Sequence, residues 1–181
     1  MSEKLPTRKE AFRILSQTGC SANVIKHCKA VAKLAVEIAK VFEEKGMKIN
    51  KGTVEIGALL HDIGRSKTHT VHHAIEGAQI AESMNLPSVI IKIIKRHVGG
   101  GIGPEEADRL GWPKGTYVPE TFEEKIVSYA DKLVEGSNHV TIERTIEKFR
   151  FDDKIPSSAI IKIEELHEEM MSVLGDHKCL Q

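Results

Sequence analysis

Apolar residues recur every three or four positions along most of this chain, which is the spacing of the buried face of an α-helix. Two stripes are the clearest: Val24, Val31, Leu34, Ala35, Ile38, Val41 and Phe42, and then Ile160, Ile163, Leu166, Met170 and Val173. No segment of strand length alternates between apolar and polar residues. The pattern predicts an all-α fold, a bundle of helices around one core.

Capping residues predict where several of these helices begin. Ser21 has the position and chemistry of an N-cap, and Asn50 or Thr53 precedes the next apolar run. Thr121 and Glu124 have the spacing of a capping box. The expected helices are 7–17, 21–45, 53–62, 71–84, 87–98, 104–110, 121–135, 141–149 and 157–174.

Length and composition predict one globular domain covering 1–181, because 181 residues with 40% apolar content can build a single core. Lysine plus arginine and aspartate plus glutamate number 26 each, so no net field attracts nucleic acid or an anionic membrane. No segment has the ~20 apolar residues of a spanning helix, and the N-terminus lacks a signal core, which favours a cytoplasmic protein. Cys20, Cys28 and Cys179 include no Cys-x-x-Cys pair and are expected to be free thiols.

One long stretch, from Gly99 to Pro119, is rich in glycine and proline and interrupts the helical pattern. Irregular segments of this length in a compact domain are often lids or binding loops. Its first part, "GGGIG", follows no strand, so a dinucleotide-binding fold is not indicated. A flexible lid or a plain turn is the expectation.

Histidines and aspartates fall at or near the ends of several expected helices, next to apolar positions where polar side chains are costly to bury without partners. The residues concerned are His27, His61, Asp62, His73, His97 and Asp131. A single such residue is more often a helix cap or a satisfied polar group than a metal ligand. Six of them on helices that a bundle brings together indicate a shared site.

The order His27, then His61 and Asp62 in "HDIG", then Asp131 resembles the HD-domain superfamily of metal-dependent phosphohydrolases, over most of residues 21–140. The resemblance implies an α-helical HD domain with its metal-binding core at about 21–140 and additional helices at 141–174. His73, four residues before Gly77, and His97 match the extra histidines of members that bind two metals.

The resemblance also implies the ligand set of a dinuclear site. Asp62 would bridge the metals, with one metal held by His27, His61 and Asp131 and the other by His73 and His97. Imidazole and carboxylate ligands suit Fe, Mn or Zn better than Mg or Ca. His72 is a second candidate for the position of His73, because His69, His72 and His73 share one helical face.

Two metals about 3.5–4 Å apart can bind a phosphoryl oxygen and lower the pKa of a shared water. The candidate catalytic residues are Asp62, Arg65 and Lys67, and the candidate substrate-binding residues are Arg65, Lys67, Arg96 and Lys132, which lie close to the expected ligands in sequence. Arginine can hold phosphate in a bidentate manner, and lysine acts as a point charge. The expected partner is a phosphorylated small molecule resembling a nucleotide, not nucleic acid or a membrane.

Departures from subfamily patterns narrow the resemblance. Arg65 stands where single-metal nucleoside monophosphatases usually have glutamate, and Ala74 replaces a proline of the cyclic-dinucleotide phosphodiesterases. The sequence is most similar to the small dinuclear type that hydrolyses diadenosine tetraphosphate, although residues 99–120 are an insertion relative to that type. The expected activity is hydrolysis of a phosphoester or phosphoanhydride.

Two alternatives remain open. Dinuclear-iron oxygenases of the same superfamily have the same ligand types, so the ligands alone do not exclude dioxygen chemistry. A binding module that keeps a metal for stability is the other alternative, although structural metal sites are normally closed to water.

Overall fold

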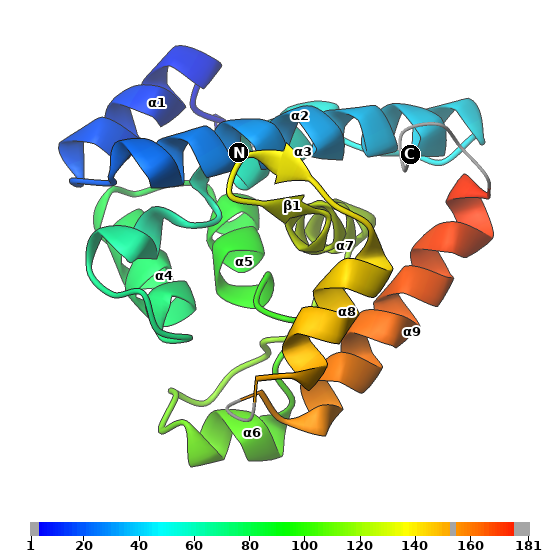
Figure 1. Cartoon of the computed structure of the whole chain (residues 1–181). Coiled ribbons are helices and arrows are strands. Elements are labelled where there is room, and N and C mark those ends of the chain that lie inside the picture. The colour runs from blue at the N-terminus through cyan, green and yellow to red at the C-terminus, as the bar shows by residue number, and fades with distance from the viewer. Residues whose placement is uncertain (1–3, 153–154, 176–181) are drawn as a thin grey trace.

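The computed structural model describes residues 4–152 and 155–175, and these form a mostly helical fold with one small hairpin (Figure 1). The elements are α1 (Arg8–Gln17), α2 (Ala22–Glu44), α3 (Lys51–Leu60), the 3-10 helix η1 (Ile63–Ser66), α4 (His73–Ser83), α5 (Ser88–Arg96), α6 (Pro104–Arg109), α7 (Phe122–Lys132), β1 (Val134–Glu135), β2 (Asn138–His139), α8 (Ile142–Arg150) and α9 (Ser157–Leu174). The predicted all-α class and each of the nine predicted helices are confirmed, apart from shifts at their ends.

Side-chain caps explain several of the helix starts. The Ser21 hydroxyl accepts a hydrogen bond in the first turn of α2, and Asn50, rather than Thr53, caps α3. Thr121 accepts from the backbone N–H of Glu124 at 3.3 Å, which is half of the expected capping box. The Glu124 carboxylate instead binds Arg96, so the reciprocal half is replaced by an ion pair.

The longest helix, α2, packs against both α3 and α7 and organises the main core. Side chains such as Ile38, Phe42, Leu59 and Ile126 are fully buried there. Helix α4 packs against α5 and η1 on one side of this core, and α8 and α9 lie together on the other (Figure 1). The ends of α3, α5 and α7 therefore meet in the middle of the molecule.

The Gly/Pro-rich insertion packs around its own small apolar cluster. Its buried members are Ala74, Ile102, Ala107, Trp112 and Tyr117. The rings of Trp112 and Tyr117 meet edge to face with centroids 4.8 Å apart. At the start of the "GGGIG" run, Gly99 and Gly100 form a turn, one of the two predicted alternatives, in which Gly101 N–H donates to the Val98 carbonyl at 3.0 Å. The turn is closely packed, because a Cβ on Gly100 would lie 2.3 Å from the Lys162 carbonyl oxygen of α9.

The segment after α7 differs from its prediction. The helix expected to reach residue 135 ends at Lys132, and a two-stranded hairpin follows in which Val134 pairs with His139. Strands of two residues are too short to produce a recognisable alternation.

Two other expectations concern thiols and membranes. Cys20 and Cys28 are buried free cysteines, as predicted, whereas Cys179 lies outside the described residues. Within 4–152 and 155–175, no helix is both long and apolar enough to cross a membrane.

Candidate metal centre

The structure brings the six predicted histidines and aspartates to one place. His27 lies on α2 and Asp131 near the end of α7, while His61 and Asp62 directly follow α3. His73 begins α4 and His97 directly follows α5. Elements that are far apart in sequence thus supply the members of the cluster.

All four histidines are oriented by the same kind of hydrogen bond. Each Nδ1 lies 2.7–2.8 Å from a backbone carbonyl oxygen, and the four carbonyls belong to Gly136, Ala58, Thr70 and Ile94. Because a carbonyl oxygen only accepts, each Nδ1 must carry the proton. In the neutral imidazole the Nε2 atom then presents its lone pair, so all four rings are fixed in the tautomer that binds metal through Nε2.

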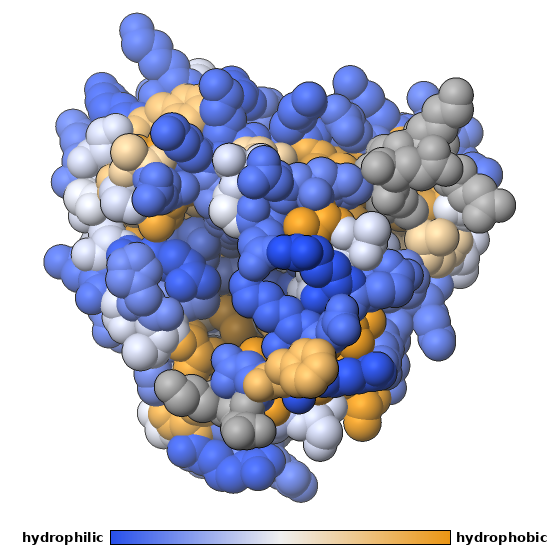
Figure 2. All heavy atoms as spheres, in the orientation of Figure 1, coloured by the Kyte–Doolittle hydropathy of each residue, from blue (hydrophilic) through white to orange (hydrophobic). Residues whose placement is uncertain are grey.

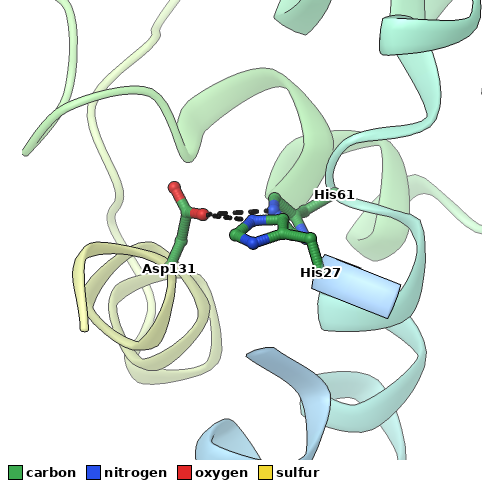
Figure 3. Close-up of side chains that lie close together, drawn as sticks. All are labelled: His27, His61 and Asp131. Carbon is green, nitrogen blue, oxygen red and sulfur yellow. Dashed lines mark hydrogen bonds and ion pairs between the residues drawn. The ribbon is translucent and has the colours of Figure 1, made fainter. Parts of the chain in front are cut away.

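The four Nε2 atoms converge with the carboxylate oxygens. Figure 3 shows His27 and His61 both directed at Asp131, whose Oδ1 lies 2.9 Å and 3.4 Å from their Nε2 atoms. On the other side, the Nε2 atoms of His73 and His97 are 3.0 Å apart. Lone pairs and carboxylate oxygens at these distances repel one another unless a metal ion, or a proton on one of the nitrogens, lies between them.

Asp62 faces both halves of this cluster with different oxygens. Its Oδ1 lies 3.1 Å from His73 Nε2 and 3.5 Å from His97 Nε2. Its Oδ2 lies 3.7 Å from the Nε2 atoms of both His27 and His61. A carboxylate between two pairs of imidazoles has the arrangement expected of a bridging ligand.

Among the described residues, two buried side-chain polar atoms have no hydrogen-bond partner, His61 Nε2 and Asp62 Oδ1. An unpaired buried polar atom costs about 1–3 kcal/mol, and such atoms often mark an ion. Ligand atoms of His27, His61 and Asp131, and of His61, Asp62 and His97, lie within 4.8 Å of one another. The donor set therefore fits divalent metal.

The pKa values of His61, Asp62 and Asp131 are shifted by the opposite charges that lie close together in the cluster. Burial opposes the charged form of His61, but Asp62 and other neighbours outweigh burial and hold the pKa of His61 well above its ordinary value. Burial likewise opposes ionisation of Asp62 and Asp131. Their cationic neighbours, first His61 for Asp62 and Lys132 for Asp131, hold both pKa values well below the ordinary range.

Unlike the pKa of His61, the pKa of His97 is lowered, because burial disfavours the charged imidazolium and shifts the value from 6.5 to about 4. Between pH 6.5 and pH 4, His97 binds a proton in the unfolded chain but not in the folded, metal-free chain. The free energy of unfolding therefore falls as pH falls, by about 1.4 kcal/mol per pH unit. We expect the free energy of unfolding of chelator-treated protein to drop by roughly 2 kcal/mol between pH 6.5 and 4.5. Urea unfolding at each pH measures it.

The matched variant for this prediction is His97→Gln, which cannot titrate. Its free energy of unfolding should depend less steeply on pH over the same interval. Equal slopes for the variant and the unaltered chain would contradict the assignment of the slope to His97.

Four cationic residues were expected to bind substrate, and the structure places them differently. Arg65 donates from Nε to Asp62 Oδ2 at 2.7 Å, and Lys132 pairs with Asp131. Both line the cavity described below. Lys67 is exposed and is absent from the described cavity walls.

Arg96 is buried in an ion pair away from that cavity. Its guanidinium donates to Glu124 and Glu120 at 2.8–3.1 Å and to the carbonyl of Thr116 at 3.2 Å. The sequence interpretation of Arg96 as a substrate-binding residue does not agree with this geometry. Adjacent positions on a helix face different directions, so Arg96 faces away from the cluster that His97 joins.

Arg96→Met is therefore expected to affect stability. Removing one partner of a buried ion pair costs about 3–5 kcal/mol, because the other charge stays buried without compensation. Urea unfolding should show a loss of about 3 kcal/mol. The exposed Lys92→Met on the same helix should change stability by less than about 0.5 kcal/mol. A fully stable Arg96→Met would overturn the structural role.

The structure distinguishes His73 from His72 as the candidate metal ligand. His73 points into the cluster, whereas His72 Nδ1 accepts a hydrogen bond from Trp112 Nε1 at 3.0 Å. His69 is exposed and lines the cavity.

A cavity of about 550 Å³ opens beside the cluster, a volume typical of small-molecule sites. Figure 2 shows the hollow between α5 and α8, with hydrophobic residues inside it. Sequence reasoning missed several of its walls, including Glu106, Arg109, Phe149 and Ala159. No local motif marks them, because only the packing of α6, α8 and α9 brings them to the cluster.

Comparison with known proteins assigns the fold to a family. The HD domain profile matches residues 24–136, which include His27, His61, Asp62 and Asp131 and cover more than half of the chain. The chain belongs to the HD domain family. The predicted resemblance to this superfamily is thereby confirmed, while the finer similarity to enzymes acting on diadenosine tetraphosphate stays a prediction.

Individual relatives of this HD domain protein differ in what is known of them. It is 42% identical over 157 residues to an uncharacterized protein of Methanocaldococcus jannaschii, covering 86% of this chain and 92% of that protein. It is 38% identical over 171 residues to a tRNA (cytidine(56)-2'-O)-methyltransferase of Picrophilus torridus, covering 94% of this chain and 48% of the enzyme. The chain thus spans about half the length of that methyltransferase.

A solved structure shares the fold. The HD domain of the L. monocytogenes phosphodiesterase PgpH, in complex with cyclic-di-AMP, matches with a TM-score of 0.55 and 20% identity, covering 91% of this chain and 98% of that domain. This likeness supports the HD fold over nearly the whole chain.

Proposed function

We propose that this HD domain protein is a metal-dependent phosphohydrolase that cleaves a phosphoester or phosphoanhydride bond of a nucleotide-like substrate. The observation that carries the proposal is the convergence of four Nε2 lone pairs on the Asp62 carboxylate, with each Nδ1 committed to a backbone carbonyl. Such a donor set suits Fe, Mn or Zn.

The assignment of ligands follows the two sides of Asp62. His27, His61 and Asp131 would hold one divalent ion and His73 and His97 the other, with Asp62 shared between them. When bound, two ions polarise a phosphoryl oxygen and lower the pKa of a water, which supplies the nucleophile.

The remaining groups act on the substrate and on the ligands. Arg65 fixes the orientation of Asp62 through its Nε bond and lines the cavity, where its guanidinium is available to a phosphoryl oxygen. Lys132, which pairs with Asp131, lines the same wall and adds a second positive charge. The cavity beside them is large enough for a nucleoside, which supports a nucleotide-like substrate.

The test combines metal content with a substrate panel. The purified chain is loaded separately with Mn²⁺, Fe²⁺ or Zn²⁺, and metal per chain is measured. Hydrolysis is then followed over nucleoside monophosphates, diadenosine tetraphosphate, cyclic dinucleotides and short oligonucleotides, with and without dioxygen. The fold shared with a phosphodiesterase bound to cyclic-di-AMP is a reason to include cyclic dinucleotides.

About two ions per chain and hydrolysis that does not depend on dioxygen are expected. Turnover that requires dioxygen would replace the proposal by an oxygenase. Metal-loaded protein that hydrolyses no member of the panel would replace it by a metal-stabilised binding module.

His97→Ala tests the second ion specifically. Because this variant removes one of the two histidine ligands on the His73 side, metal content should fall from about two ions per chain to about one. His69→Ala is the matched control, since His69 lines the same cavity and is not among the proposed ligands. Equal metal content in both variants would contradict the two-sided assignment.

A further inference from the structure

Two neighbouring pockets, here called lobes, are lined by residues of the metal cluster. The larger pocket, about 550 Å³, includes His73 and His97 in its wall, and we call it the apolar lobe. The smaller pocket, about 260 Å³, includes His27, and we call it the basic lobe. Arg65, Asp131, Lys132 and Phe149 line both lobes, so the two lobes meet at the cluster.

The apolar lobe has the composition of a site for a planar, mostly apolar group. Val71, Val98, Ile102, Leu110 and Phe149 contribute to its wall. Glu106 and Arg109, from α6, add an acceptor and a donor at the same wall. An aromatic face with a few polar groups suits a nucleobase.

The basic lobe differs in charge. It contains Arg144 and Lys148 from α8, in addition to Lys132 and Arg65. Arg144 and Lys148 share a single carboxylate, Glu135, at 3.1 Å and 2.5 Å, so this group keeps one positive charge in excess. Both cations are more than 60% exposed, which leaves them accessible to a ligand.

The position of α8 makes this lobe a built feature rather than a scatter of surface charge. The Thr145 hydroxyl donates to the carbonyl oxygen of Lys132 at 2.6 Å and so ties α8 to the end of α7, beside Asp131. Arg144, Thr145, Lys148 and Phe149 follow at helical spacing and all line the basic lobe. One face of α8 therefore closes this side of the site.

The geometry points to a second phosphate-binding site, formed by Arg144 and Lys148 in the basic lobe. This inference rests on the proposed function and deepens it. The substrate is a nucleotide phosphodiester that places a nucleoside in the apolar lobe, the scissile phosphate at the cluster, and a further phosphate in the basic lobe. Arginine and lysine side by side are suited to bind that phosphate.

The reaction of such a substrate balances with water alone. The water oxygen bonds to phosphorus as one phosphorus–oxygen ester bond breaks, and a proton goes to the leaving sugar oxygen. The products are one phosphomonoester and one free hydroxyl. No oxidant or additional reactant is consumed.

The experiment compares substrates that differ by one group. Protein loaded with Mn²⁺ is assayed with the dinucleoside phosphate ApA, its 5'-phosphorylated form pApA and its 3'-phosphorylated form ApAp. Two analogues of pApA, each lacking one of the two bases, are assayed in the same way. We expect kcat/KM for either pApA or ApAp to exceed that for ApA by about tenfold or more, from charge-assisted contacts to the added phosphate. Removing one of the two bases should lower kcat/KM by about tenfold.

Variants locate the added phosphate. In Arg144→Gln combined with Lys148→Gln, the ratio of kcat/KM for the preferred phosphorylated dinucleotide to that for ApA should fall toward one. Arg150→Gln is the matched control, because Arg150 lies on the same helix but pairs with Glu164 and is not part of the lobe. This control should keep the ratio.

The outcomes separate the two proposals. Equal kcat/KM for ApA, pApA and ApAp would overturn the second phosphate site but not the proposed hydrolysis. An unchanged ratio of kcat/KM for the phosphorylated dinucleotide to that for ApA in the double variant would overturn it as well. Hydrolysis of diadenosine tetraphosphate or monophosphates but not of any dinucleotide would overturn the phosphodiester assignment alone. Failure of metal-loaded protein on the whole panel would overturn the proposed function itself.

Discussion

Asp62→Ala is expected to bind little or no metal and to lose hydrolytic activity by more than about 100-fold, since changes even to residues that only support metal ligands cost about 10–100-fold. Asp62 directs its two oxygens to the two sides of the cluster, so its loss affects both proposed ions. Metal per chain and kcat/KM measure the effect. Helical content by circular dichroism should be nearly unchanged, because Asp62 follows α3 and caps no helix through its side chain.

The control for this variant is Asp108→Ala. Asp108 is an exposed aspartate of α6 that is not part of the cluster. The Asp108→Ala variant should have the same metal content and activity as the unaltered chain. Unchanged metal content in Asp62→Ala would rule out the bridging role.

Gly64→Ala is expected to be the most destabilising small substitution near the site. A Cβ at Gly64 would lie 1.9 Å from the carbonyl oxygen of His73 and 2.6 Å from the backbone nitrogen of Gly77. Both atoms are backbone atoms of α4, so no side chain can move aside, and α4 would have to separate from η1. We expect a loss of about 3 kcal/mol or more in the free energy of unfolding, measured with urea.

Gly46→Ala is the matched control for the backbone cost of adding a methyl group. Gly46 has a φ of +85°, but a Cβ there would meet nothing within 4 Å. Its cost should be limited to about 1–2 kcal/mol of left-handed backbone strain. An equal loss in both variants would show that the contact between η1 and α4 is not what requires glycine at position 64.

The helices could be predicted from the sequence because their signals are local. The stripe through Ile38 and Phe42 repeats with helical period, and Ser21 marks the start of the same helix. The hairpin at Val134–Glu135 and Asn138–His139 gives no such signal, because two residues cannot establish a period. The packing of the insertion around Trp112 was likewise hidden, since it depends on contact with α4.

The convergence of the histidines and aspartates was predictable for a different reason. The order of His27, His61, Asp62 and Asp131 is that of the HD-domain superfamily, so the resemblance predicted that these side chains lie together. Composition alone does not predict this. The direction of Arg96 could not be obtained in the same way, because closeness in sequence to His97 says nothing about which side of the helix it faces. The proposed roles of Arg144 and Lys148 depend on a contact between α7 and α8 that no local pattern in the sequence indicates.

The small apolar cluster of the insertion has a consequence for how this domain can diversify. Ile102, Ala107, Trp112 and Tyr117 are held together by their own contacts and by Ala74, and none of them is a proposed metal ligand. Ile102 also forms part of the apolar lobe. Replacing this cluster by residues of other sizes would therefore reshape the pocket wall at Ile102 without changing a proposed metal ligand, so the shape of the pocket and the ligand set can vary separately.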